Sequence, residues 1–155
     1  MFTNPGGRND LTSMVIGAAI EVHKECGPGL LESVYTECLA YELADRGLEV
    51  ERGTAIPLTY RGRSLSTRFY LDLRVNRAVI VEVKSVSALA PVHTAQVLTY
   101  LKLTNCHVGL LINFNVPLLK DGIARVIRPL RTAGASVGDV DKRRNGGTKE
   151  AERGS

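Results

Sequence analysis

Two acidic residues and a lysine near the middle of the chain have the types and order of a metal-dependent hydrolytic site. Asp72 precedes Glu82, and Lys84 follows Glu82 after a single valine. Side chains alternate along a strand, so Glu82 and Lys84 point to the same face of an extended segment. Two carboxylates are suited to hold Mg²⁺, which polarises a phosphate and lowers the pKa of its bound water. Lys84 would orient that water or stabilise the developing negative charge.

The segment that carries these charges otherwise has the composition of a buried strand. Residues 78–86 are mostly β-branched, which predicts a central strand buried on both faces. Charges in such a place cost on the order of several kcal/mol unless they are paired or bind a metal. An edge strand with a solvent-exposed ion pair is the alternative. If residues 65–75 pair with residues 78–86 as a hairpin, Asp72 lies on the neighbouring strand, and both carboxylates and the ammonium converge.

Hydrophobic periodicity predicts the elements that must position these residues. Apolar residues at three- and four-residue steps predict helices, and alternating or β-branched runs predict strands. The order of two helices, a three-strand meander, a helix and a strand predicts an α/β fold with a mixed β-sheet packed against helices. We expect helices over residues 10–25, 31–46 and 91–104, and strands over residues 55–60, 65–75, 78–86, 107–113 and 123–127.

The length of 155 residues and the hydrophobic content of 44% suit a single domain. We expect residues 10–130 to form it, after a flexible lead-in over residues 1–9. Residues 131–155 lose the apolar periodicity, which predicts a disordered or weakly ordered tail. No run approaches the ~20 apolar residues that span a bilayer, and the first residues lack the apolar stretch of a secretory signal. A cytoplasmic protein without membrane attachment is therefore expected.

The basic residues are concentrated in one stretch of the chain. Six arginines between residues 52 and 77 face a single acid, Asp72. Arginine without compensating acid favours a surface that contacts phosphates, and a solvated hairpin face is the alternative. Arg61, Arg63 and Arg68 are the candidate nucleic-acid-binding residues. Residues 1–130 carry 14 basic and 12 acidic groups, which predicts weak nonspecific affinity or a partner protein that delivers the substrate.

Two helical positions add polar candidates to the site. His93, Gln96 and Tyr100 fall on one face of the third predicted helix and could contact phosphate oxygens or stack on a base. A tyrosine half in the core and a structural histidine are the alternative. Glu32 lies in the first turn of the second helix, where the helix dipole alone would favour an acid. The same position would let its carboxylate face the sheet. Three scattered cysteines without a C-x-x-C pair argue against zinc or iron–sulfur sites.

These motifs together resemble the PD-(D/E)XK nuclease superfamily, and residues 29–35 resemble the motif that names its GxxExxY family. The resemblance covers roughly residues 10–130. It implies a restriction-endonuclease-like fold, a mixed β-sheet flanked by α-helices, with a Mg²⁺- or Mn²⁺-dependent nuclease site. The further segments that carry the resemblance are Glu21-Val22-His23-Lys24, Gly27-Pro28-Gly29, Asp72, Glu82-Val83-Lys84, Pro91-Val92-His93, Gln96, Tyr100-Leu101-Lys102 and Asn113-Phe114-Asn115.

The resemblance also implies a role for each site residue. Asp72 and Glu82 match the metal-binding acids, and Lys84 matches the catalytic lysine. Glu32 matches a helix glutamate that completes the metal site. Gln96 and Tyr100 match the Q-x-x-x-Y element of RecB-like and lambda-exonuclease-like members. Leu71 stands where a proline can precede the first acid of the motif.

Two functions follow as hypotheses. The first is a metal-dependent nuclease that hydrolyses phosphodiester bonds in nucleic acid, DNA rather than RNA. The alternative is a catalytically silent nucleic-acid-binding or protein-interaction module on the same fold. The sequence is compatible with a homodimer, since a small sheet can leave an edge strand to pair.

Overall fold

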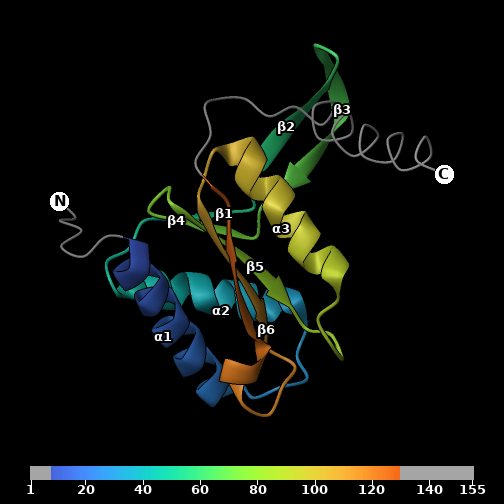
Figure 1. Cartoon of the computed structure of the whole chain (residues 1–155). Coiled ribbons are helices and arrows are strands. Elements are labelled where there is room, and N and C mark those ends of the chain that lie inside the picture. Colours follow the sequence, from blue (N-terminus) through green and yellow to red (C-terminus); the bar gives the residue numbers. More distant parts are fainter. Residues whose placement is uncertain (1–7, 130–155) are drawn as a thin grey trace.

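The computed structural model of the chain describes residues 8–129 (Figure 1). The predicted tail (131–155) lies outside these residues, as does the predicted lead-in except for residues 8 and 9, which begin the first helix. No helix of the described part is long and apolar enough to cross a membrane. The elements in chain order are α1 (Arg8–Cys26), α2 (Glu32–Asp45), β1 (Val50–Arg52), β2 (Ala55–Tyr60), β3 (Arg63–Tyr70), β4 (Leu73–Val75), β5 (Val79–Lys84), α3 (Pro91–Thr104), β6 (Val108–Asn113), η1 (Leu119–Gly122) and β7 (Ile123–Ile127).

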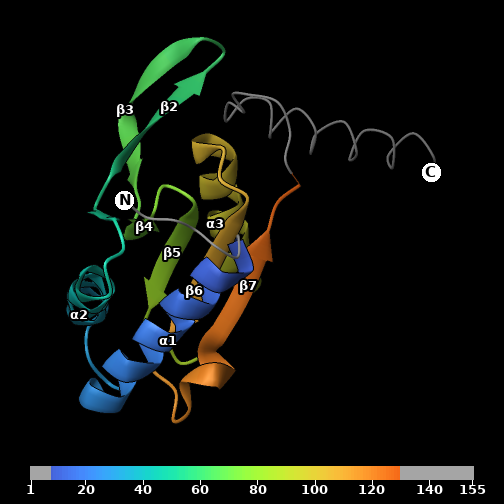
Figure 2. The ribbon, with the colours of Figure 1, turned by 90° about the vertical axis from the view of Figure 1, so that its left-hand side faces the viewer.

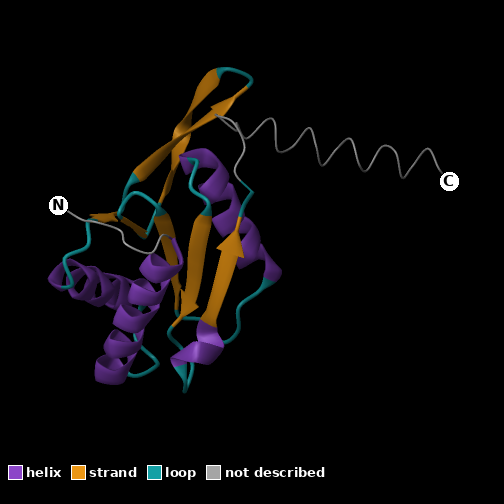
Figure 3. Cartoon of the chain, turned by 60° about the vertical axis from the view of Figure 1, so that its left-hand side comes forward, coloured by secondary structure: helices purple, strands orange, loops and turns teal. Residues whose placement is uncertain are grey.

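A five-stranded mixed sheet, in the order β1-β4-β5-β6-β7, is the centre of the fold. β5 and β6 pair in parallel, and the other neighbours are antiparallel. A parallel pair needs a crossover connection, and α3 supplies it. As Figure 3 shows, helices lie on both faces of this sheet. The predicted mixed sheet flanked by helices is therefore confirmed.

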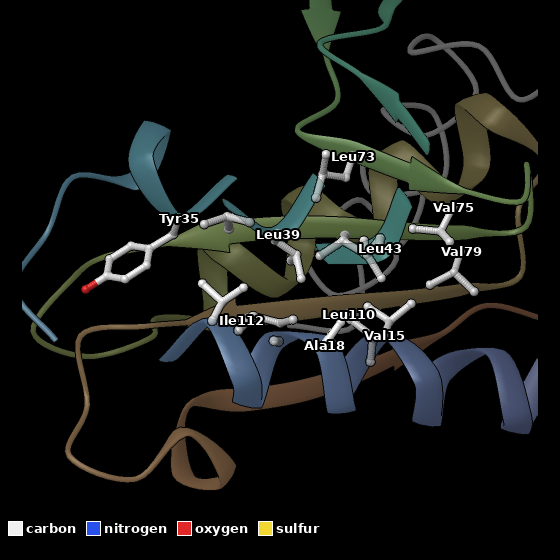
Figure 4. Packing of buried hydrophobic residues seen from close by; sticks show 14 of the residues in the cluster. Val15, Ala18, Tyr35, Leu39, Leu43, Leu73, Val75, Val79, Leu110 and Ile112 are labelled. Carbon is white, nitrogen blue, oxygen red and sulfur yellow. The ribbon is translucent and has the colours of Figure 1, made fainter. Parts of the chain in front are cut away.

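Alternation along β5 divides the core into two layers. Val79, Val81 and Val83 point to the face that α1 and α2 cover, where they join the larger hydrophobic cluster. Figure 4 shows part of this cluster, with side chains of α1 and α2 packed against strand residues such as Leu110. Ile80 points to the opposite face and packs under α3. Glu82 and Lys84 have the same parity as Ile80, so both lie on the α3 side.

One glycine of β6 permits the observed packing of α3 against the sheet. Gly109 of β6 sits beneath Val97, and a Cβ atom added there would lie 2.6 Å from Val97 Cγ1. That distance is far inside van der Waals contact, so the absence of a side chain at residue 109 permits the observed packing. In this packing, Gln96 of α3 lies within hydrogen-bond distance of Lys84 on β5.

The β2–β3 hairpin, hereafter the arm (residues 55–70), forms a separate two-stranded sheet that projects beyond the main sheet (Figures 1 and 2). The predicted pairing of residues 55–60 with the following strand is confirmed, but the three segments do not form one continuous meander, because residues 65–75 are divided between two sheets. Only Leu73–Val75 pairs with β5, while Arg63–Tyr70 pairs with β2. The chain bends between β3 and β4, and an unpredicted strand, β1, takes the place beside β4. Pairing of this kind depends on contacts between distant segments, which local alternation does not encode.

The prediction for residues 78–86 holds. β5 spans Val79–Lys84, and its first five residues are buried. Neighbouring strands pair with β5 on both edges, and helices cover both of its faces. Its β-branched side chains therefore pack into the hydrophobic clusters on both faces of the sheet. The charged end of this strand is therefore placed in the interior and not at a solvent-exposed edge.

Candidate active site

Glu82 and Lys84 form an ion pair beneath α3. Glu82 is only 5% exposed, and its Oε1 lies 3.4 Å from Lys84 Nζ. Lys84 Nζ also donates a hydrogen bond of 3.3 Å to Oε1 of Gln96 on α3. The ammonium is thus held between a strand carboxylate and a helix amide, which orients it although a lysine side chain is flexible.

Asp72 reaches the same place from the bend that precedes β4. It does not lie on a strand, contrary to the expectation from sequence. Leu73 pairs with Val81, so continuing this register places Asp72 opposite Glu82. Its Oδ2 accepts a hydrogen bond of 2.8 Å from the backbone N–H of Val83. The bend therefore keeps the side chain of Asp72 beside Glu82, although the backbone of Asp72 is not part of the β4–β5 pairing.

The two carboxyl groups have perturbed acidity. Burial is the main cause that raises the pKa of Glu82 to about 8, and the nearby charge of Asp72 adds to it against the opposing effect of Lys84. The pKa of Asp72 is raised mainly by burial, while the Val83 N–H bond acts in the opposite direction. One lysine cannot compensate two ionised carboxylates, and in the cation-free site a proton on Glu82, hydrogen-bonded to Asp72, relieves this deficit of positive charge.

The atom that shows this deficit most directly is Oε2 of Glu82. It is buried and has no hydrogen-bond partner in the described structure. In the ionised carboxylate this oxygen lacks a donor, and either a proton shared with Asp72 or a cation between the two groups would satisfy it. Two carboxylates with an unsatisfied buried oxygen fit a hard divalent cation such as Mg²⁺ or Mn²⁺.

The predicted polar face of α3 divides into three environments. Gln96 contacts Lys84, as described. Tyr100 is buried in the α3-side core, where its ring packs edge-on against Phe69 at a centroid distance of 5.5 Å. Burial first, and then the carboxylate of Glu82, raises the pKa of Tyr100 to about 12, so its hydroxyl remains a proton donor at neutral pH. His93 accepts a hydrogen bond of 2.9 Å from the backbone N–H of Ala90 at its Nδ1 and so caps α3.

Glu32 lies at the rim of the site. Its Oε1 accepts a hydrogen bond of 3.2 Å from the Ser85 backbone N–H, directly after β5. Its charge is one of the influences that raise the pKa of Asp72. Within residues 8–129, however, no three His, Cys, Asp or Glu side chains converge as a metal site. The role of Glu32 as a third metal ligand therefore stays a prediction.

Two residues that sequence reasoning did not assign hold the rim in place. The Ser85 hydroxyl donates a hydrogen bond of 2.6 Å to the carbonyl of Leu30 and so ties β5 to the segment before α2. Asn113, at the end of β6, accepts from the Val86 N–H and donates to the Val86 carbonyl, both at 3.0 Å. The Asn113-Phe114-Asn115 motif was the available signal for Asn113, whereas nothing in the local pattern distinguished Ser85.

The contacts of Tyr35 explain why the motif over residues 29–35, which runs into the first turn of α2, ends in tyrosine. Its hydroxyl donates to the Gly27 carbonyl at 2.5 Å and accepts from the Leu30 N–H at 3.1 Å. Its ring stacks on Phe114 at a centroid distance of 4.5 Å. Tyr35 thereby fixes the turn that delivers Glu32 to Ser85, and Gly29 in this turn has a φ of +97° that favours glycine.

Asp72, but not Glu82, lines a groove of about 590 Å³ that opens to solvent and whose walls also include Glu32, Arg52 and Tyr70. A second hollow of about 500 Å³ adjoins it at Glu32 and is lined also by Ser85. Both hollows surround the first turn of α2. A ligand of moderate size can therefore approach Asp72 from the side of α2 and the base of the arm.

Some of the arginines of residues 52–77 form ion pairs with acidic residues. This corrects the expectation from sequence that these arginines lack compensating acids. Nη1 of Arg77 lies 2.8 Å from Oε1 of Glu51, and Glu51 also forms an ion pair with Arg74. Arg52 lies 3.7 Å from Glu37. The arginines of the arm, Arg61, Arg63 and Arg68, are exposed and form no ion pair with any described residue. Among the arginines of residues 52–77, those without an ion pair to a described residue are thus the three on the arm.

A profile of the PD-(D/E)XK nuclease superfamily matches residues 9–126. The chain belongs to this superfamily. The match spans every element that positions the carboxylate pair, and the mixed sheet with helices on both faces is consistent with the restriction-endonuclease-like fold of PD-(D/E)XK proteins. A nucleic-acid substrate and a divalent metal such as Mg²⁺ are general properties of PD-(D/E)XK nucleases. Searches of curated proteins and of solved structures gave no match.

Proposed function

We propose that this PD-(D/E)XK protein is a Mg²⁺- or Mn²⁺-dependent nuclease of the GxxExxY family that hydrolyses phosphodiester bonds in DNA. The observation that carries the proposal is the buried pair of Glu82 and Asp72 beside Lys84, in which Oε2 of Glu82 has no donor once the carboxyl group is ionised. A purely structural ion pair would be expected to satisfy both carboxyl oxygens, because an unpaired buried acceptor is costly. A cation-binding role explains why the arrangement tolerates it.

The roles of the residues follow from their positions. Asp72 and Glu82 would hold the cation, which supplies Lewis-acid polarisation of the phosphate and a water of lowered pKa. Lys84, held by Glu82 and Gln96, presents an ammonium that orients the attacking water or stabilises charge on the phosphate. Gln96 is a positioning residue, since it contacts Lys84.

Three further groups have supporting roles in the proposal. Glu32 positions the first turn of α2 at the mouth of the site through its bond to Ser85. The protonated hydroxyl of Tyr100 is a donor near the carboxylate pair. Arg61, Arg63 and Arg68 on the arm provide unpaired positive charge for the phosphates of the substrate.

A second candidate is a catalytically silent module that binds nucleic acid or a protein. The observation in its favour is that the described residues contain no set of three side-chain metal ligands. A site with only two carboxylates holds a cation more weakly than one with three. This candidate predicts nucleic-acid binding without cleavage and without dependence on Lys84.

Cleavage of labelled single- and double-stranded DNA and RNA, with Mg²⁺ or Mn²⁺ and with a chelator, tests the proposal. The variants are Asp72→Ala and Lys84→Ala, and the exposed Lys120→Ala on η1 is the matched control. Metal-dependent cleavage of DNA that disappears in both site variants and persists in the control supports the nuclease. Binding without cleavage supports the silent module, and equal cleavage by all variants identifies a contaminating activity.

A further inference from the structure

Tyr70 is an exposed aromatic residue at the mouth of the candidate active site. It is the last residue of β3, is 62% exposed, and lines the same groove as Asp72 and Glu32. Neither the carboxylate pair nor the core uses its ring. An aromatic face left open beside a phosphodiester-cleaving centre is a surface on which a nucleobase can stack.

Strand alternation explains why the ring points outward. Phe69, the preceding residue, turns to the core side and packs against Tyr100 of α3. Ile56, its partner on β2, lies in the same cluster. Because successive side chains on a strand point to opposite faces, anchoring Phe69 on α3 forces Tyr70 to the open face. The hydrophobic cluster that holds Phe69 therefore also fixes the direction in which the side chain of Tyr70 points.

The charges along this face suit a nucleic-acid strand. Arg68 lies two residues from Tyr70 on β3 and shares its face, and it is exposed without an ion pair to any described residue. Residues 53–71 contain no acid. Arg52 lies on the groove wall and forms an ion pair of 3.7 Å with Glu37, in which both side chains are about half exposed. Because such an exposed ion pair contributes little free energy, Arg52 can exchange Glu37 for a phosphate of the substrate at a small free-energy cost. An aromatic ring next to basic side chains is the combination that binds single strands.

We propose that Tyr70 is a stacking platform for an unpaired base next to the scissile phosphate, so that the groove takes a single DNA strand. This inference rests on the proposed function. A base inside a duplex is covered on both faces by its neighbours, so it can stack on Tyr70 only after it leaves the helix. The groove volume of about 590 Å³ lies within the range of sites that hold a ligand of this kind.

The test measures binding and stacking separately from cleavage. The full chain is titrated, with Ca²⁺ in place of Mg²⁺, into a single-stranded oligodeoxynucleotide that carries the fluorescent base 2-aminopurine, and into a blunt duplex of the same sequence. Tyr70→Ala should weaken single-strand affinity about tenfold and abolish the stacking-dependent quenching, whereas Tyr70→Phe should retain both. Tyr41→Ala is the matched control, because Tyr41 is 65% exposed on α2 and lies outside the groove.

Unchanged single-strand affinity in Tyr70→Ala, or an equal loss for the duplex, would overturn the inference. Cleavage assays with the same variants separate this failure from that of the proposed function. If Lys84-dependent cleavage occurs but Tyr70→Ala cleaves and binds normally, only the stacking inference fails. If no cleavage occurs but Tyr70-dependent stacking persists, the nuclease proposal fails and the groove remains a single-strand binding site.

Discussion

The ammonium of Lys84 lies 3.4 Å from one carboxyl oxygen of Glu82, while the other oxygen of that carboxyl group is buried without a hydrogen-bond partner among the described residues. The ammonium of Lys84 therefore pairs with only one of the two carboxyl oxygens of Glu82. Asp72, whose charge acts on Glu82, adds negative charge and not a donor. This relationship between Glu82 and Lys84 underlies three of the predictions below.

The stability of the cation-free protein should fall as the pH rises. The folded-state pKa of Glu82, about 8, lies above its ordinary value of 4.5, so the folded state binds the proton more tightly. Stability is full below about pH 4.5 and decreases up to about pH 8, at no more than about 1.4 kcal/mol per pH unit. Urea unfolding in chelator at several pH values measures this slope. Glu82→Gln should flatten it, and a slope equal to that of wild type in this variant would contradict the assignment. The exposed Glu21→Gln is the control.

Divalent cations should stabilise the folded protein through the same pair. Mn²⁺ at one hundred times its dissociation constant should add about 2.7 kcal/mol to the free energy of unfolding. Asp72→Asn retains the size of the side chain but removes its charge, so the added stability should largely disappear. Calorimetric titration and thermal unfolding, with and without Mn²⁺, measure both effects. Equal stabilisation of Asp72→Asn would place the cation elsewhere.

Lys84→Ala should separate metal binding from catalysis. Removing the ammonium leaves both carboxylates, so Mn²⁺ affinity should be unchanged or increased because a competing positive charge is gone. The rate constant for cleavage should fall about 100- to 1,000-fold, the usual effect of removing one charge-stabilising donor. Single-turnover cleavage alongside Mn²⁺ titration provides the measurement. A variant in which Mn²⁺ binding disappears in parallel with cleavage would instead give Lys84 a structural role.

Charge reversal on the arm should weaken DNA binding in a salt-dependent manner. Arg61→Glu, Arg63→Glu and Arg68→Glu each remove a positive charge that has no ion-pair partner among the described residues. The slope of log affinity against log salt should decrease by about 0.7 for a single strand and about 0.9 for a duplex with every phosphate that the variant no longer neutralises. Fluorescence anisotropy at several salt concentrations measures it. Lys120→Glu, outside the arm, is the control, and equal slopes for all variants would remove the arm from the interface.

Gly109→Ala should displace α3 and thereby disturb Lys84. The added Cβ would lie 2.6 Å from Val97 Cγ1, an overlap that should destabilise the fold by about 1–3 kcal/mol. Cleavage should fall as well, because Gln96 moves with the helix away from Lys84. Val97→Ala removes the clashing atom, so the double variant should recover part of the stability and of the cleavage rate. Absence of recovery in unfolding and cleavage assays would show that the overlap with Val97 is not the cause.

Local pattern was sufficient to predict most elements and the proximity of Asp72, Glu82 and Lys84. α1, α2, α3 and β5 follow from the periodicity of their own apolar residues, and Glu82 and Lys84 share a face because they lie two positions apart on one strand. The parity that places them under α3, and not under α1 and α2, was not predictable. It depends on which helix covers which face of the finished sheet.

The tertiary structure decided where residues 63–70 leave the main sheet and which groups Glu51 and Glu32 contact. The bend at Asp72 separates residues 63–70, which pair only with β2 in the arm, from residues 73–75, which pair with β5. Glu51 reaches Arg74 and Arg77 only because β1 lies beside β4. Glu32 binds Ser85 across the end of the sheet. The sequence by itself determined the elements and the chemistry they carry, since these depend on neighbouring residues. Which acid meets which base depends on contacts between segments far apart in the chain, and only the folded protein brings those segments together.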